Sequence, residues 1–230
     1  MKHAVVDDER LVERGPGIWS LCEPFKLLGA SFGRRMVIVS RNGLTGVFSP
    51  NQDLKRTMDT AFGESFQVDC LIAPTAFHDT YFAEAVSSYP DAKRLVSAAF
   101  PSGVDDTAEI HQSWPDAWKE TLIPFAIDGM PKIQETVFFD KETSTLVVSD
   151  LFFNFDENWD LWTKTFTRMV GAFGEPRMSR LFRLCIKDKK ALKKSMEPLL
   201  ELPVENILPS HGKVVLGSGR SVLFGLYERV

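Results

Sequence analysis

One histidine of this chain stands where a strand runs into a loop. The stretch Ile207-Leu208-Pro209-Ser210-His211-Gly212 reads as a short buried strand whose loop delivers His211, one of only four histidines. Imidazole is the most common metal ligand in proteins and titrates near neutral pH. Ser210 does not form a dyad with it, because adjacent residues on an extended segment point apart. His211 therefore needs partners from elsewhere in the chain.

The three cysteines are poor candidates for chemistry. Cys22, Cys70 and Cys185 lie far apart with no C-x-x-C spacing, and two of them sit inside apolar runs. Apolar burial raises the pKa of a thiol, and the thiolate is the nucleophile. We expect small buried hydrophobic side chains rather than nucleophiles, a disulfide or a metal cluster.

Two other features can shape a ligand site. Gly217-Ser218-Gly219-Arg220 opens an apolar helix, so its backbone N–H groups and Arg220 suit a carboxylate or phosphate, although glycine pairs also serve as plain helix-start turns. An aromatic cluster that includes Phe152 and Phe153 follows Asp150 and either lines an apolar pocket or packs in the core. Arg34 and Arg35 are most simply interpreted as surface or ion-pair residues.

Composition excludes several classes of partner. The chain has 27 Lys+Arg against 31 Asp+Glu, a formal charge of −4, which gives no basic field for nucleic acid. Asp7, Asp8, Glu9 and Arg10 interrupt any signal peptide, and no later run suits a membrane span. We expect a soluble, cytoplasmic, single domain over residues 1–230, with a small-molecule ligand as candidate partner. The letters do not indicate an oligomeric state.

Strand and helix signals alternate along the chain. Strands are predicted at residues 18–22, 36–40, 44–48, 68–73, 93–96, 122–127, 135–140, 145–149 and 206–208. Helices are predicted from a cap at Ser49 with Pro50 next to it, at residues 81–88, from Asn158, and at the chain end. Helices before, between and after two groups of strands favour a four-layer αββα sandwich. The pattern also fits one mixed sheet with helices on both faces, so it predicts only the α/β class.

Three stretches, in this order, resemble the metallo-β-lactamase-fold family. They are "LIAPTAFHDTYFAEAV", at the place of the family's His-x-His-x-Asp-His box; "GMPKIQETVFFDKETSTLVVSDLFF", with a hairpin and a strand ending at Asp150; and "ENILPSHGK", with His211 and Gly212. The resemblance runs from about Ile18 to the C-terminus, and it is closest to a branch with a degenerate metal box. It implies the αββα sandwich.

The resemblance also implies a ligand set. Thr75, Phe77 and Met130 stand where the family has the three histidines of its first metal, and none is a credible ligand. At the second metal Asp79, Asp150 and His211 survive, while Thr80 replaces the fourth ligand and His78 lies one place out of register. With His78 turned inward, two His and two Asp can hold one Fe²⁺, Mn²⁺ or Zn²⁺.

Structural uses compete with this set. His78 can hydrogen-bond backbone, Asp79 can cap a helix, and Asp150 and His211 can hydrogen-bond each other to fix two loops. Our first interpretation is therefore a metallo-β-lactamase-fold protein without the dinuclear centre or any cofactor, in a binding or structural role. The alternative is a hydrolase of an ester, thioester or phosphoester with one Zn, Fe or Mn ion, which requires His78 and His211 to converge. An interaction protein is the third class.

Overall fold

The structure of the chain is a computed structural model. The structure describes residues 10–101 and 103–230. Asp7, Asp8 and Glu9, on which the expectation about a signal peptide rests, lie outside this range. Within it, no helix has both the length and the apolar character needed to cross a bilayer.

The first sheet has seven strands and is mixed. Its first half is antiparallel and includes a hairpin closed by the Asn42-Gly43 turn. Its second half is parallel, and helices make the first two of its three connections. The strand order is β1 (Val12–Gly15), β2 (Ile18–Glu23), β5 (Arg34–Arg41), β6 (Leu44–Phe48), β7 (Cys70–Ala73), β8 (Lys93–Val96) and β9 (Thr107–Glu109).

The second sheet has four strands. Three form an antiparallel meander, and the last, β13, pairs in parallel with β12. The order is β10 (Leu122–Ala126), β11 (Thr136–Asp140), β12 (Thr145–Val148) and β13 (Asn206–Pro209). A separate small hairpin is formed by β3 (Lys26–Leu27) and β4 (Ala30–Ser31).

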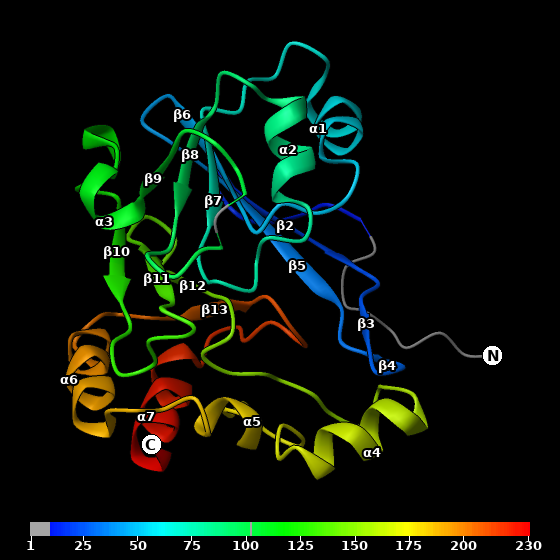
Figure 1. Cartoon of the computed structure of the whole chain (residues 1–230), viewed down its shortest axis with the longest axis vertical. Helices are drawn as coiled ribbons and strands as arrows, with labels where there is room; N and C mark the ends of the chain where they lie inside the picture. Colours follow the sequence, from blue (N-terminus) through cyan, green and yellow to red (C-terminus); the bar gives the residue numbers. More distant parts are fainter. Residues whose placement is uncertain (1–9, 102) are drawn as a thin grey trace.

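Helices cover the outer faces of the two sheets (Figure 1). On the first sheet, α1 (Leu54–Phe62) and α2 (Phe82–Ser88) bury Leu54, Met58, Phe82 and Ala85 against the strands. On the second sheet, α6 (Lys189–Leu200) and α7 (Gly219–Arg229) do the same with leucines and Met196. The remaining helices are α3 (Ile110–Ser113), the 3₁₀ helix η1 (Asp116–Trp118), α4 (Leu161–Met169) and α5 (Arg180–Arg183).

The two sheets pack face to face through one shared core. Phe48 of the first sheet meets Phe138 of the second with ring centroids 4.7 Å apart, and Trp114 stacks on Phe138. At the rim, Arg41 donates two hydrogen bonds of 2.7 Å to Asp140, a buried ion pair that joins β5 to β11. The predicted four-layer αββα sandwich is therefore confirmed, and the single-sheet alternative is wrong.

Most predicted elements are present, with one instructive exception. Ser49 was predicted to cap a helix, but it lies at the end of β6 with φ 53°. The helix begins later, after Asp53, which also has a left-handed backbone. The buried Asn51 occupies the intervening loop and donates to backbone carbonyls of Leu21 and Arg34. The prediction of a helix cap at Ser49 is therefore wrong, because residues 49–52 form a loop before the helix.

Candidate metal site and adjoining pocket

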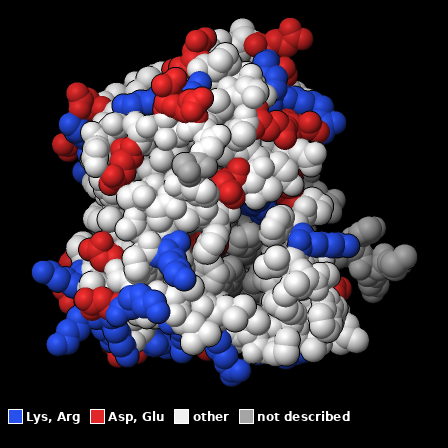
Figure 2. Space-filling view, viewed as in Figure 1, with Lys and Arg blue, Asp and Glu red and all other residues white. Residues whose placement is uncertain are grey.

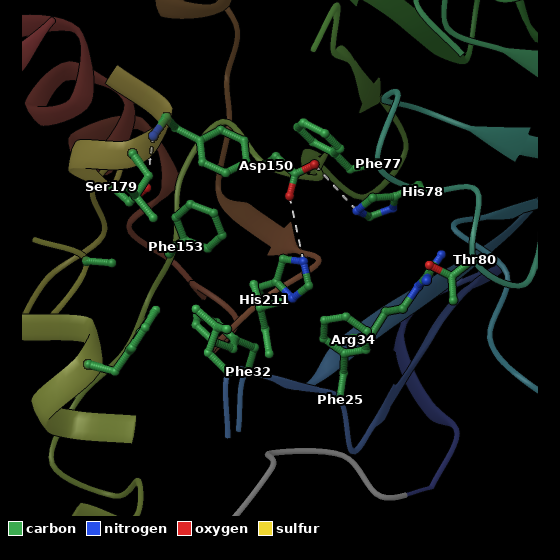
Figure 3. A pocket seen from close by; sticks show the side chains of 16 residues that line it. Phe25, Phe32, Arg34, Phe77, His78, Thr80, Asp150, Phe153, Ser179 and His211 are labelled. Atoms are coloured by element: carbon green, nitrogen blue, oxygen red, sulfur yellow. Dashed lines mark hydrogen bonds and ion pairs between the residues drawn. The ribbon is translucent and has the colours of Figure 1, made fainter. Parts of the chain in front are cut away.

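Three loops deliver His78, Asp150 and His211 to one place. Asp150 and His211 each follow the end of a strand, β12 and β13, which pair in parallel with Val148 opposite Pro209. Because parallel strands end at the same edge of a sheet, the two side chains emerge as neighbours. His78 comes from the loop after β7 in the other sheet, so loops from both sheets form the site (Figure 3).

The donor atoms converge on the Asp150 carboxylate. Nε2 of His78 lies 3.7 Å from Oδ2 of Asp150, and Nε2 of His211 lies 3.6 Å from Oδ1. One donor atom from each residue falls within 4.8 Å of the others. The convergence of His78 and His211 that a hydrolase requires is thus present.

The far nitrogen of each imidazole has its own partner. Nδ1 of His211 donates to the carbonyl oxygen of Gly33 at 2.6 Å, which leaves its Nε2 as a lone-pair donor facing Asp150. Nδ1 of His78 contacts the Ser49 hydroxyl. Such partners fix the ring orientation of metal-ligating histidines. Burial lowers the pKa of His211 to about 4, so its imidazole is neutral at pH 7, the form that binds metal ions.

Asp150 is held as a carboxylate from several sides. Burial by itself raises the pKa of Asp150, but His78, His211 and the Thr75 hydroxyl outweigh it and lower the pKa below its ordinary value. Thr75 Oγ1 donates to Oδ2 at 3.0 Å. Behind the loop, the buried Glu135 accepts hydrogen bonds from the backbone N–H groups of Ser149 (2.7 Å) and Asp150 (3.0 Å). The Asp150 side chain is therefore preorganised.

The loop that carries His211 is tied to the first sheet by Arg35. This side chain is buried, contrary to the expectation of a surface residue, and Nη1 donates to the carbonyl oxygens of Pro209 (2.5 Å) and Gly212 (2.9 Å). The Arg35 backbone N–H donates to Ser210 at 2.7 Å. Gly212 has φ 85° and packs directly on the Asn154 backbone. These contacts set the position of His211.

A pocket of about 350 Å³ opens beside the three residues. Figure 2 shows this face hollowed between the regions labelled α5 and β3–β4 in Figure 1, with a mostly uncharged surround. Leu27, Leu28, Phe77 and Leu181 at its rim are each about half exposed or more. Its walls are largely aromatic: Phe25, Phe32, Phe77, Phe153, Phe166 and Phe182. An apolar ligand suits such a lining.

Arg34 also lines this pocket and differs from its neighbour Arg35. It too was expected at the surface, but the residue is only 3% exposed. Its Nε and Nη2 are buried without a hydrogen-bond partner, and its guanidinium lies 5.1 Å from the centroid of the Tyr81 ring. Burial lowers the pKa of Arg34, and Tyr81, Asp150, Asp79 and Glu23 act in the opposite direction.

Several predicted site residues lie elsewhere. Asp79 is exposed and is not one of the clustered donors, because its carbonyl oxygen starts the turn into α2. Phe152 is fully buried in the core under α6 and α7, whereas its neighbour Phe153 faces the pocket, since successive extended residues point to opposite sides. Cys22 and Cys70 are buried as expected, and Cys185 is partly exposed.

At the start of α7, the groups that could hold an anion make contacts within the fold. The backbone N–H groups of Gly219 and Arg220 donate to the carbonyl oxygens of Glu205 (2.9 Å) and Val204 (2.8 Å). A Cβ at position 219 would lie 2.8 Å from Val204, so this glycine serves close packing. Arg220 is exposed above Phe224 and does not line the pocket. These contacts agree with the use of this segment as a plain helix start.

Three residues stand at the positions where the family resemblance places the ligands of a first metal: Thr75, Phe77 and Met130. The Thr75 hydroxyl donates a hydrogen bond to Asp150, Phe77 lines the pocket, and Met130 is buried in the core. Thr80 lines the pocket mouth next to His78. Nothing in the letters marked Ser49, Gly33 and Glu135 as supporting residues, because their roles depend on contacts between distant segments.

The chain is similar to known proteins in its fold and not in its sequence. No protein-family model matches the chain, and no curated protein matches it in sequence. Solved structures do match. A metallo-β-lactamase from Pontibacter korlensis aligns with TM-score 0.60 and 15% identity over 96% of this chain and 99% of its own. A metallo-β-lactamase from Erythrobacter litoralis gives 0.59 and 12% over 96% and 92%.

A second kind of protein shares the architecture. The metal-soaked Flv1 flavodiiron core from Synechocystis sp. PCC6803 aligns with TM-score 0.67 and 14% identity, over 96% of this chain and 60% of that chain. The described chain therefore has the metallo-β-lactamase fold, as the three motifs predicted. Because lactamases and flavodiiron cores share it, the fold does not select a reaction.

Proposed function

We propose that the chain is a metal-dependent hydrolase that uses one ion, held by His78, Asp150 and His211. The observation that carries the proposal is the convergence of three ligand atoms within 4.8 Å of one another. The contacts of Gly33 and Ser49 with the far nitrogens of the imidazoles support it further.

The chemistry of the donor set fits a divalent ion. Two imidazole nitrogens and one carboxylate suit Zn²⁺, and the same set with open positions suits Fe²⁺. All three ligand residues line the pocket, so an ion held by them would be accessible from the pocket, where a substrate can approach. Asp79 is not included, because it is exposed and outside the cluster. The ligand set proposed is therefore smaller by one residue than the sequence suggested.

An ion bound there supplies Lewis acidity and makes hydroxide available near neutral pH. The protein residues contribute orientation and charge. Asp150 places one negative charge between the two imidazoles, and Thr75 and Glu135 keep that carboxylate and its loop in place. The aromatic wall excludes water and binds the apolar part of an ester, thioester or phosphoester.

The test is hydrolysis of three aryl substrates by metal-loaded protein: 4-nitrophenyl butyrate, S-phenyl thiobutyrate and bis(4-nitrophenyl) phosphate. We expect turnover of at least one, lost with a chelator and restored by Zn²⁺, Mn²⁺ or Fe²⁺. Asp150→Ala should abolish this turnover, whereas Asp79→Ala, a matched control on the same face, should retain it. Turnover that survives both the chelator and Asp150→Ala contradicts the proposal.

A second candidate is a binding protein without catalysis. The observation that favours it concerns the three residues at the positions of the family's first metal. Thr75 donates to Asp150, and Phe77 and Met130 offer no metal ligand. The same pocket then binds a small molecule, and Asp150 with the two histidines fixes the loops. Ligand binding that does not change when metal is added, with no turnover of any ester, distinguishes this role.

A further inference from the structure

We propose that Arg34 binds a carboxylate of the substrate, so that the pocket selects amphipathic monocarboxylates whose apolar part lies against the aromatic wall. The inference deepens the proposed function and rests on it for catalysis. Binding of the carboxylate itself does not require the metal ion. Arg34 plays no part in the ligand set described above, and nothing in the sequence pattern distinguished it from Arg35.

The first reason is that the buried Arg34 guanidinium has N–H donors without hydrogen-bond acceptors. Its Nε and Nη2 have no hydrogen-bond partner, and in the described part of the chain no carboxylate lies within ion-pair distance of it. Buried charged donors normally have partners, since leaving them unpaired is costly. The guanidinium lies over the Tyr81 ring, 5.1 Å from its centroid, and this contact provides no acceptor for Nε or Nη2. An anion supplies the missing acceptors.

The second reason is position. Arg34 begins the long strand β5, so its backbone is fixed by the sheet. Figure 3 shows its side chain extending toward Thr80 on the His78 side of the pocket, within the same cavity as Asp150 and His211. Among the described residues that line the cavity, it is the single Lys or Arg. An anion bound there lies beside the proposed metal ligands.

The charge balance favours a carboxylate over a phosphate monoester. Within the described part of the chain, the lining holds one guanidinium, Arg34, and one carboxylate, Asp150. A planar carboxylate matches the fork of a guanidinium with two parallel hydrogen bonds and one negative charge. A dianion would bring an excess negative charge into an apolar cavity beside Asp150. Because a large aromatic wall lies next to this single cation, the cavity suits a ligand with one charged end and one apolar end.

The test is calorimetric titration of chelator-treated protein at pH 8 with 4-phenylbutyrate, 4-phenylbutan-1-ol and phenyl phosphate. We expect the carboxylate to bind about 10- to 100-fold more tightly than the alcohol, the range of one charged, bidentate contact. Phenyl phosphate should bind more weakly than the carboxylate. Equal affinity for the acid and the alcohol overturns the proposal, and tighter binding of the phosphate overturns the choice of carboxylate.

Variants separate this contact from general effects. Arg34→Met should reduce the affinity for 4-phenylbutyrate to that for the alcohol and leave the alcohol unchanged, and Arg34→Lys should restore part of the loss. Arg220→Met, which removes an exposed arginine outside the pocket, should change neither. An acid preference that persists in Arg34→Met contradicts the assignment.

Failure of the hydrolase proposal is recognised separately. His211→Ala should abolish metal-dependent turnover and keep the preference for the acid in the metal-free titration. If turnover exists, Arg34→Met should raise KM for mono(4-nitrophenyl) glutarate about 10-fold or more and leave KM for the neutral 4-nitrophenyl butyrate unchanged. Equal KM changes for both esters would assign Arg34 to packing alone.

Discussion

Nε2 of His211 lies 3.6 Å from Oδ1 of Asp150, while Nδ1 of the same ring donates to the Gly33 carbonyl oxygen at 2.6 Å. The Gly33 contact gives His211 one tautomer and orients its ring, with Nε2 unprotonated and facing Asp150. The lone pair of Nε2 is directed to the space that the second imidazole, His78, also faces. A histidine that served only to fix a loop would need one partner, whereas here the ring is aligned at both nitrogens.

Ser49 should influence metal affinity although it is not a ligand. Its hydroxyl contacts Nδ1 of His78, so Ser49→Ala frees the ring and should weaken binding of Zn²⁺ about 10- to 100-fold. Competition with a chromophoric chelator measures the affinity. Ser87→Ala, on an exposed face of α2, is the matched control. Unchanged affinity in Ser49→Ala would mean that the loop alone orients His78.

Gly212→Ala should displace the His211 loop. The residue has φ 85°, and a Cβ there would lie 2.2 Å from the backbone oxygen of Asn154. We expect a loss of about 3 kcal/mol in the free energy of unfolding from clash and strain together. Gly217→Ala also has a positive φ, 68°, but meets nothing within 4 Å, so its loss should be only about 1 kcal/mol. Urea unfolding compares the two, and equal losses would contradict the clash.

Arg34 and Arg35 are neighbours in sequence and should respond oppositely to removal. Arg35→Met leaves the buried carbonyl oxygens of Pro209 and Gly212 without donors and should lower the free energy of unfolding by about 2–5 kcal/mol. Arg34→Met removes an unpaired buried charge and should leave stability equal or higher. Thermal unfolding of the ligand-free protein tests both. Strong destabilisation by Arg34→Met would reveal a structural role.

Only one thiol of the native protein should react quickly with a disulfide reagent. Cys22 and Cys70 are buried, and burial raises the pKa of Cys70 to about 12, so little thiolate forms at pH 8. Cys185 is partly exposed. A colorimetric thiol titration should count one thiol in the folded protein and three after denaturation. Rapid reaction of more than one thiol in the folded state would contradict the burial of the first sheet.

The strands were predictable because they carry their own pattern. Leu44–Phe48 was expected and found over the same residues, since an Asn-Gly turn and an apolar run fix both its ends. The position of Asp150 and His211 followed from the same logic, because both come directly after short apolar strands. His78 could be assigned only to the correct loop, since the direction of a loop side chain depends on contacts that the letters do not contain.

What escaped prediction depends on tertiary contacts. Arginines are usually exposed, so Arg34 and Arg35 were expected at the surface, yet one ties a loop and the other faces a cavity. Ser49 has the type and spacing of a helix cap, but the backbone turns left-handed there and its hydroxyl serves His78 instead. Asp79 was taken for a ligand from its motif position, and the turn into α2 directs it outward.

The central claim is tested most directly by the metal content of the purified protein, measured by elemental analysis without nickel affinity or chelator, after incubation with Zn²⁺, Mn²⁺ or Fe²⁺ and desalting. The account predicts about one ion per chain in the unaltered protein and in Asp79→Ala, and a near-complete loss in His211→Ala and Asp150→Ala. No bound ion under any of these conditions, or the same content in all four proteins, would contradict it.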